Sequence, residues 1–130
     1  MKILFVDDTR DTRELFRMAL KIQGVETHLA GDGLEAIKAV EDQTFDAIIM
    51  DVEMPRMNGW DAVRHIRTLS NGQAVPIFMF TAYGNGENRK KALDTGANDL
   101  WHKPILPIEI LNRVAKHLTG APSYKAATNS

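Results

Sequence analysis

Short apolar segments alternate with segments of helical apolar spacing along most of this 130-residue chain, and this alternation constrains the fold more than any other feature. Five segments are predicted to be strands: residues 3–6, 25–30, 47–50, 75–80 and 99–102. Polar residues interleave the second of them, as expected at a sheet edge. Strands that alternate with helices form a parallel sheet with helices on both faces, so we expect a doubly wound α/β domain.

The segments between the strands carry helix signals. Leu15, Ala19 and Ile22 repeat at helical spacing, and Asp11 with Glu14 is predicted to form a capping box that opens this first helix. Further helices are predicted at residues 34–40, 62–69, 87–95 and 108–118. The predicted order of elements is therefore a strand followed by a helix, five times over.

The length indicates one domain, which we place at residues 1–118. The pattern of core positions stops after Leu118. Residues 119–130 are rich in Gly, Pro, Ser, Thr and Ala, and are predicted to be a flexible tail or the stub of a linker. A segment of this length is too short for a helix-turn-helix, so no DNA-binding element is expected there.

Composition excludes several classes of protein. A net charge of −1 gives no general attraction to nucleic acids or anionic membranes. The chain has no cysteine, which excludes a disulfide framework, a thiolate metal site and a cysteine nucleophile. No apolar stretch approaches the ~18 residues of a membrane-spanning helix. Because Met1 leads directly into the first predicted strand, leaving no room for a signal peptide, we expect a cytoplasmic protein.

Reactive side chains collect where the predicted strands end. Asp7 and Asp8 follow the first strand, Asp51 the third, Thr81 the fourth and Lys103 the fifth. Ligands of open parallel sheets bind beyond the carboxyl ends of the strands, so these five residues are expected to share one rim. Adjacent carboxylates repel each other, and their repulsion has to be offset by solvent, a cation or a catalytic use.

The side chains at this rim suit phosphoryl transfer. Three clustered carboxylates favour a divalent cation with a preference for oxygen ligands, such as Mg2+. A carboxylate can also attack phosphorus as a nucleophile, which forms an acyl phosphate. An ammonium group such as that of Lys103 offsets phosphoryl charge, and the hydroxyl of Thr81 can donate a hydrogen bond to a phosphoryl oxygen.

At this point the sequence resembles the receiver domains of response regulators in two-component signalling, in particular the single-domain chemotaxis type. The matching stretches cover the chain from Lys2 to about Leu118 and read ILFVDD, AGDGLEA, DAIIMDVEMPRMNG, PIFMFTA and GANDLWHKPI, followed by the closing helix. The resemblance implies a flavodoxin-like five-stranded sheet of order 2-1-3-4-5. It also implies a switch that works by phosphorylation, and not an enzyme acting on separate substrates.

The resemblance assigns roles to individual residues. Asp51 would be the phosphoacceptor, taking its phosphoryl group from a phosphohistidine of a sensor kinase or of a phosphotransfer protein. Asp8 would bind Mg2+ directly and Asp7 through water, with Asp51 and the backbone carbonyl of Glu53 as further ligands. A metal over Asp7 and Asp8 would explain why two carboxylates stand side by side.

The remaining implied roles concern the phosphoryl group and the response to it. Thr81 and Lys103 would contact the phosphoryl oxygens, and the peptide bond between Lys103 and Pro104 would be cis. Glu53 adds charge and Tyr83 adds bulk beside the site, and both would tune how fast water reaches the phosphoryl group. The fourth helix, fifth strand and fifth helix would form the surface that binds or releases an output protein.

One position departs from the family pattern. Receiver domains usually carry Tyr or Phe three residues before the lysine, whereas this chain has Leu100 there and an aromatic residue next, Trp101. Neighbouring strand residues point to opposite faces, so Trp101 cannot simply take the place of the missing ring. We therefore expect weaker aromatic gating or a different mode of partner binding.

Other interpretations remain open. The chain could be the receiver part of a longer regulator with an output domain. A small phosphatase of the haloacid dehalogenase type would also use an aspartate nucleophile, but such enzymes carry Asp-x-Asp after the first strand, and here the order is Asp7, Asp8, Thr9. A flavin carrier would need a phosphate loop of Ser, Thr and Gly after the first strand, and the segment from Thr9 to Thr12 has no glycine and carries the acidic Asp11. The sequence predicts a monomer or weak dimer without direct contact to nucleic acid or membrane insertion.

Overall fold

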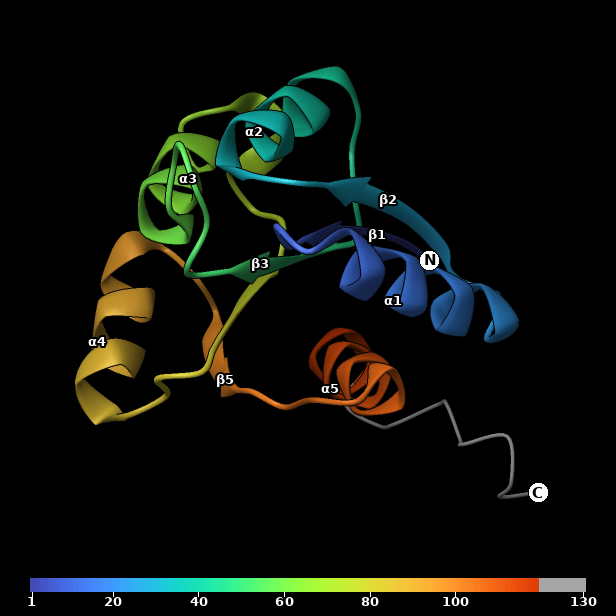
Figure 1. The fold of residues 1–130 in the computed structure, drawn as a ribbon. Helices are drawn as coiled ribbons and strands as arrows, with labels where there is room; N and C mark the ends of the chain where they lie inside the picture. Colours follow the sequence, from blue (N-terminus) through green and yellow to red (C-terminus); the bar gives the residue numbers. More distant parts are fainter. Residues whose placement is uncertain (120–130) are drawn as a thin grey trace.

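A computed structural model describes residues 1–119 of the chain. It contains a five-stranded, all-parallel sheet of order β2-β1-β3-β4-β5, which confirms the predicted fold (Figure 1). The elements in chain order are β1 (Lys2–Val6), α1 (Arg10–Ile22), β2 (Glu26–Ala30), α2 (Gly33–Asp42), β3 (Ala47–Asp51), α3 (Gly59–Ile66), a 3-10 turn (Ser70–Gly72), β4 (Ile77–Thr81), α4 (Gly86–Thr95), β5 (Asp99–His102) and α5 (Pro107–Thr119). Residues 120–130, most of the predicted tail, lie outside the described part.

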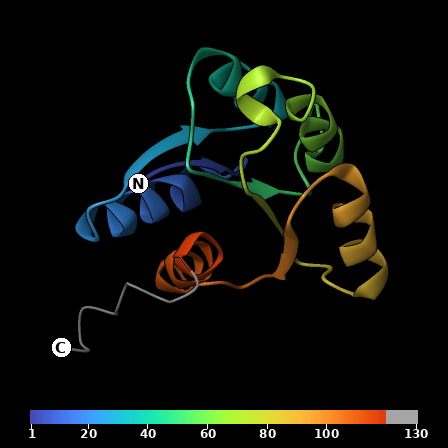
Figure 2. The same cartoon turned by 180° about the vertical axis from the view of Figure 1, so that it is seen from behind.

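The sheet is covered on both faces. Helices α1 and α5 pack on one face, and α2, α3 and α4 pack on the other (Figures 1 and 2). Each strand divides its side chains between two cores, because successive residues point in opposite directions. In β1, Ile3 and Phe5 face α1 and α5, while Leu4 and Val6 face α2 and α3. All four are fully buried, which explains why the strand reads as a continuous apolar run.

The start of α1 differs from the prediction, and the proposed capping box of Asp11 and Glu14 is wrong. The helix begins at Arg10 after Thr9, and Asp11 lies inside its first turn. Glu14 accepts a hydrogen bond from Arg17, at 2.6 Å from its Nη2, instead of capping the helix. The side chain of Asp7 accepts from the backbone N–H of Thr9 at 2.8 Å, so the turn out of β1 is stabilised from the strand end.

Other boundaries are shifted as well, most clearly those of α3 and β4. Helix α3 spans Gly59–Ile66, where residues 62–69 were predicted, because the side chain of Asn58 accepts from the N–H of Asp61 and caps the helix earlier. Strand β4 begins at Ile77, two residues later than predicted, since Pro76 has no N–H to contribute to the ladder. Both shifts leave the carboxyl ends of the strands at the predicted positions.

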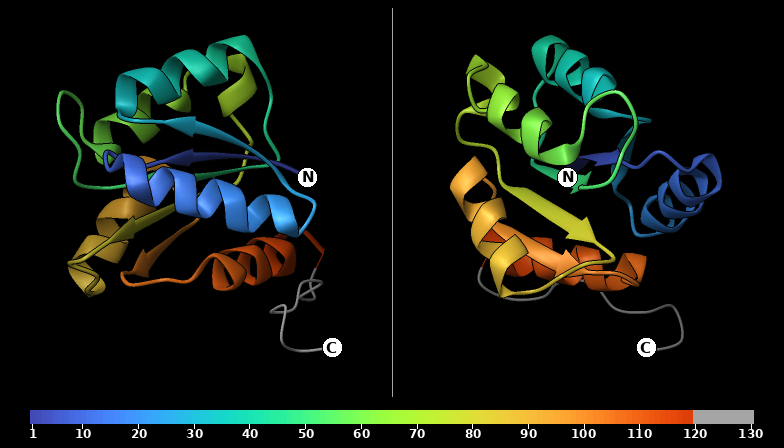
Figure 3. Two further views of the ribbon diagram at one scale, coloured as in Figure 1. Left: turned by 45° about the vertical axis from the view of Figure 1, so that its right-hand side comes forward. Right: turned by 60° about the vertical axis from the view of Figure 1, so that its left-hand side comes forward.

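Helix α1 presents two apolar stripes, and the sheet buries only one. Phe16 and Leu20 enter the core, and the ring of Phe16 stacks on Phe5 with centroids 4.6 Å apart. Leu15 and Ile22, which made the helical pattern recognisable, are 61% and 77% exposed. Figure 3 shows α1 lying beside α5 on the same face of the sheet. The exposed stripe therefore forms part of the outer surface of the molecule.

Candidate functional site

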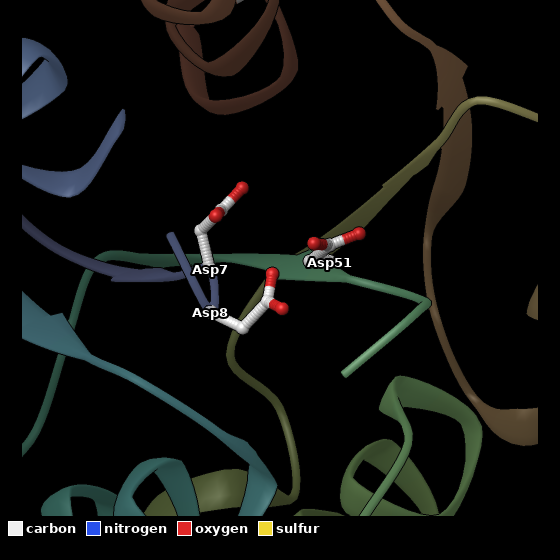
Figure 4. Close-up of side chains that lie close together, drawn as sticks. All are labelled: Asp7, Asp8 and Asp51. Carbon is white, nitrogen blue, oxygen red and sulfur yellow. The ribbon is translucent and has the colours of Figure 1, made fainter. Parts of the chain in front are cut away.

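Three carboxylates meet at the carboxyl ends of two adjacent strands. Asp7 and Asp8 follow β1 and Asp51 ends β3, and the two strands are paired through Val6 and Met50 (Figure 4). One oxygen from each carboxylate can be chosen so that all three lie within 4.8 Å of one another. The side chains of Asp7 and Asp51 are buried, and Asp8 is exposed. The cluster is thus open to solvent on one side and enclosed on the other.

Burial disfavours the ionised form of Asp51 and Asp7. Loss of hydration is the main cause that raises the pKa of Asp51 to about 6, with smaller contributions from the charges of Asp7 and Glu53, while Lys103 opposes the rise. Burial likewise raises the pKa of Asp7, and the hydrogen bond from the Thr9 backbone opposes that rise. A bound cation would compensate the energetic cost of both charges.

The donor set of this cluster fits a hard divalent cation. Every candidate ligand atom is a carboxylate oxygen, which is the ligand type that Mg2+ prefers. Asp51 Oδ1 is buried and accepts no well-formed hydrogen bond from the described residues, although Lys103 Nζ lies 3.2 Å away. A buried carboxylate oxygen with spare lone pairs is an unusual state, and metal coordination would satisfy it.

Lys103 approaches the cluster from the end of β5. Its Nζ lies 3.2 Å from Asp51 Oδ1 and 4.9 Å from the centroid of the Phe80 ring. The backbone N–H of Lys103 donates to the carbonyl of Thr81 at 2.8 Å, which extends the pairing of β4 and β5 up to the site. The peptide bond between Lys103 and Pro104 is cis, as predicted. The ammonium group is therefore placed beside the carboxylate that was predicted to accept the phosphoryl group.

Thr81 ends β4 and is completely buried, but its hydroxyl does not point to Asp51 in a hydrogen bond. It donates instead to the carboxylate of Glu53, with Oγ1 2.9 Å from Oε1 and 2.8 Å from Oε2. The same oxygen accepts the backbone N–H of Tyr83 at 3.1 Å. Glu53, Thr81 and Tyr83 were predicted to lie near the site, but the contact of Glu53 with Thr81 was not predicted, because these two residues are 28 positions apart on different segments.

The segment after Asp51 is held in place by two features that the sequence analysis missed. Gly59 lies so close to the strand that a Cβ added to it would come within 2.2 Å of the carbonyl oxygen of Asp51. Arg56, in a left-handed backbone conformation with φ of 65°, forms an ion pair with the buried Asp32 at the start of α2. The glycine after Asn58 was a visible turn signal, whereas the ion pair had no local signal.

The comparison with known protein families decides the class of this site. The profile of the response regulator receiver domain matches residues 3–115. The chain belongs to the response regulator receiver domain family. Receiver domains are the signalling switches of two-component systems, and phosphorylation and Mg2+ binding are general features of the family. Among residues 1–119, no helix is long and apolar enough to cross a membrane.

Individual relatives agree with this assignment. The response regulator MprA of Mycobacterium leprae is 40% identical over 114 residues, which are 88% of this chain and 49% of that protein. This receiver domain therefore spans about half the length of MprA. The chemotaxis protein CheY4 of Vibrio cholerae superposes with a TM-score of 0.83 at 34% identity, covering 88% of this chain and 96% of that one.

A second solved structure bears on the acidic cluster. The receiver domain of the sensor histidine kinase PA1611 from Pseudomonas aeruginosa superposes with a TM-score of 0.80 at 33% identity, covering 88% of this chain and 94% of that chain. In that protein a magnesium ion is coordinated in the active-site cleft. The oxygen-only donor set of Asp7, Asp8 and Asp51 is compatible with the same ion.

Leu100, which departs from the usual receiver pattern, and its neighbour Trp101 face opposite sides of the sheet, as predicted. Leu100 packs into the core under α4, and Trp101 packs into the core under α5. The ring of Trp101 stacks on Phe78 with centroids 4.7 Å apart, and Arg113 of α5 lies 5.3 Å from the Trp101 centroid. Trp101 is thus fixed on the face away from Leu100. The effect of Leu100 on signalling stays a prediction.

Proposed function

We propose that this receiver domain accepts a phosphoryl group on Asp51 from a phosphohistidine of a sensor kinase or phosphotransfer protein. The observation that carries the proposal is the pairing of a buried carboxylate having spare lone pairs with the ammonium of Lys103, 3.2 Å away. In the reaction, a carboxylate oxygen of Asp51 bonds to phosphorus as the bond from phosphorus to the histidine nitrogen breaks. The electron pair of that bond stays on the imidazole, and the product is an acyl phosphate.

The neighbouring side chains would support this transfer without forming bonds themselves. Lys103 offsets negative charge on the phosphoryl oxygens, and Thr81 donates a hydrogen bond to one of them once it is free to turn. Mg2+, held by Asp7, Asp8, Asp51 and the backbone carbonyl of Glu53, would supply charge neutralisation. Glu53 and Tyr83 flank the site and would set the rate at which water hydrolyses the acyl phosphate; Tyr83 is 68% exposed.

The phosphohistidine donor would dock along the exposed stripe of α1. Leu15 lines a cavity of about 550 Å³ together with Asp7 and Lys103, so the stripe begins at the mouth of the site. It continues through the exposed side chains of Met18 and Ile22. An apolar helix face that leads away from a reactive cluster suits the packing of a helix that carries the donor histidine.

The output protein would bind over α4, β5 and α5. A groove of about 510 Å³ lies there beside Trp101, and its walls include three basic side chains and two histidines: Arg89, Arg113, Lys116, His102 and His117. Arg89 is paired with Asp99 at 3.2 Å, and Asp99 is the acidic side chain of the groove. Phosphorylation would bias the position of Thr81 and the loop before α4, and with it this surface. The charge of the groove favours a partner segment that contains carboxylates.

The experiment that tests the proposed function is phosphorylation by acetyl phosphate, read by intact mass. The wild type should gain one phosphate in the presence of Mg2+ and none after chelation, and Asp51→Asn should gain none under either condition. Asp46→Asn, whose carboxylate bonds to the Lys2 backbone at the other end of the sheet, is the matched control and should behave as the wild type. An adduct that persists in Asp51→Asn, or sustained turnover of phosphate esters, would overturn the proposal.

A further inference from the structure

The hydroxyl of Thr81 is already occupied in this structure. Its one O–H is directed to Glu53, and both carboxylate oxygens lie within 2.9 Å. Hydrogen bonds to an ionised acceptor are about twice as strong as those between neutral groups. Thr81 is fully buried and Glu53 is exposed, so the contact lies at the boundary between the core and the solvent. In this conformation the hydroxyl has no second hydrogen to give to a phosphoryl oxygen.

The same arrangement opposes phosphorylation through charge. Glu53 is only two residues after Asp51, and its carboxylate reaches the hydroxyl that the phosphoryl group would need. A phosphoryl group on Asp51 would bring about two negative charges to this rim, and like charges at close range repel. The carboxylate of Glu53 and a phosphoryl oxygen therefore compete for one donor and cannot both stay beside it.

We propose that Glu53 is a positioning residue that holds Thr81 in a resting arrangement, and that phosphorylation works by displacing Glu53 from Thr81. The inference rests on the proposed function of Asp51 and adds a mechanism of regulation to it. Glu53 raises the threshold for activation because its contact has to break before Thr81 can bind the phosphoryl group. A residue that merely repelled the incoming charge would act without Thr81.

The contact extends to the first turn of α4. Thr81 Oγ1 accepts from the N–H of Tyr83 at 3.1 Å, and the side chain of Asn88 donates to the carbonyl of Tyr83 at 2.6 Å. The N–H of Asn88 is in turn bonded to Asn85, which caps α4. A movement of Thr81 away from Glu53 would thus change the position of the loop that joins β4 to α4. The resting contact sets the position of that loop.

Binding of beryllofluoride with Mg2+, a stable mimic of the phosphoryl group, tests the proposal by titration calorimetry on the full chain. Glu53→Ala should bind it roughly three- to tenfold more tightly than the wild type, the range expected for removal of one competing hydrogen bond. Glu53→Gln removes the charge but keeps an oxygen acceptor for Thr81, so its gain should be smaller. Equal gains for the two variants would mean that only charge matters and would overturn the proposal.

The second arm removes the donor. In a Thr81→Val background, which keeps the shape of the side chain but lacks the hydroxyl, Glu53→Ala should change beryllofluoride affinity by less than about twofold. A gain as large as that measured with Thr81 present would overturn the proposal. A readout without ligand comes from the amide resonance of Tyr83, which should shift in Glu53→Ala toward its beryllofluoride-bound position. An unchanged resonance would contradict the displacement.

Failure of the inference and failure of the proposed function are distinguishable. If the wild type binds beryllofluoride and Asp51→Asn does not, the phosphoacceptor stands, and the Glu53 variants then decide the inference alone. If Asp51→Asn binds as well as the wild type, the proposed role of Asp51 fails, and the inference fails with it.

Discussion

Lys103 Nζ lies 3.2 Å from Asp51 Oδ1, and this pair joins the ends of β5 and β3 across β4. The ammonium is partly exposed, and the carboxylate is buried. Burial of Asp51 outweighs the attraction of Lys103, since the pKa of Asp51 is raised to about 6 despite this contact. The carboxylate is therefore largely ionised at neutral pH, although burial makes its charge energetically costly. The cation beside it could also pair with a phosphoryl group.

Replacing Lys103 tests this balance. In Lys103→Met the pKa of Asp51 should rise above about 6, because the nearby positive charge that lowers it is lost. The rate of phosphorylation by acetyl phosphate should fall by roughly a hundredfold, the scale of losing one charged donor to a transition state. Carboxyl carbon NMR titration gives the pKa, and intact mass over time gives the rate. Lys91→Met, on α4 beside Trp60, is the control and should change neither quantity.

The buried carboxylate should destabilise the fold at neutral pH. The carboxyl of Asp51 binds its proton more tightly in the folded chain than in the unfolded one, where its pKa is near 3.8. This preference contributes stability below about pH 4, and the contribution is lost as the pH rises through about 6. Asp51→Asn should therefore be more stable than the wild type at pH 7.5 by roughly 1–3 kcal/mol, allowing for screening by solvent.

Urea unfolding of the two proteins at several pH values measures this difference. The advantage of Asp51→Asn should narrow between pH 6 and pH 4, where the wild-type carboxyl becomes protonated. Addition of Mg2+ at pH 7.5 should stabilise the wild type more than the variant, because the metal compensates the buried charge. A stability difference that is independent of pH would show that ionisation of Asp51 is not its source.

The approach of Gly59 to the phosphoacceptor strand gives a test of local packing. Gly59→Ala should destabilise the protein by roughly 1–3 kcal/mol, because its Cβ would come within 2.2 Å of the Asp51 carbonyl and force the strand or the helix to move. Phosphorylation should slow as Asp51 is displaced. Gly86→Ala is the control, since its Cβ would meet nothing within 4 Å at the first position of α4. Thermal unfolding measures the stability of both variants. An equal loss of stability in Gly59→Ala and Gly86→Ala would contradict the close approach of Gly59 to the strand as the cause.

If the exposed stripe of α1 is the docking surface, changes in it should slow phosphorylation by a protein donor but not by a small-molecule donor. Met18→Glu and Ile22→Glu should slow transfer from a phosphohistidine protein by about tenfold or more, since a charge would replace apolar contact area in the docking surface. Their rates with acetyl phosphate should stay within twofold, because a small donor needs no docking. Leu93→Glu, an exposed apolar position on α4, is the control. Equal slowing with both donors would instead indicate a distorted site.

Local patterns were sufficient to predict the architecture and most of the site. The continuous apolar runs of β1 and β3 and the helical spacing between the strands depend on neighbouring residues only, so one sequence is enough to recognise them. The rim follows from them, because the carboxyl ends of parallel strands meet at one edge and carry Asp7, Asp8, Asp51, Thr81 and Lys103. The resemblance to receiver domains then supplied roles that geometry alone would have left open.

Only the tertiary structure determined which side chains are buried and which contacts form where the local sequence allowed more than one arrangement. Helix α1 offered two apolar stripes, and only packing against Phe5 selected Phe16 and left Leu15 outside. Asp11 and Glu14 have the spacing of a capping box, but the helix begins at Arg10, and the side chain of Asp7 accepts a hydrogen bond from the N–H of Thr9 in the turn before it. The contact of Glu53 with Thr81 joins residues 28 positions apart, and such contacts depend on how loops of different strands meet in space, which no local periodicity encodes.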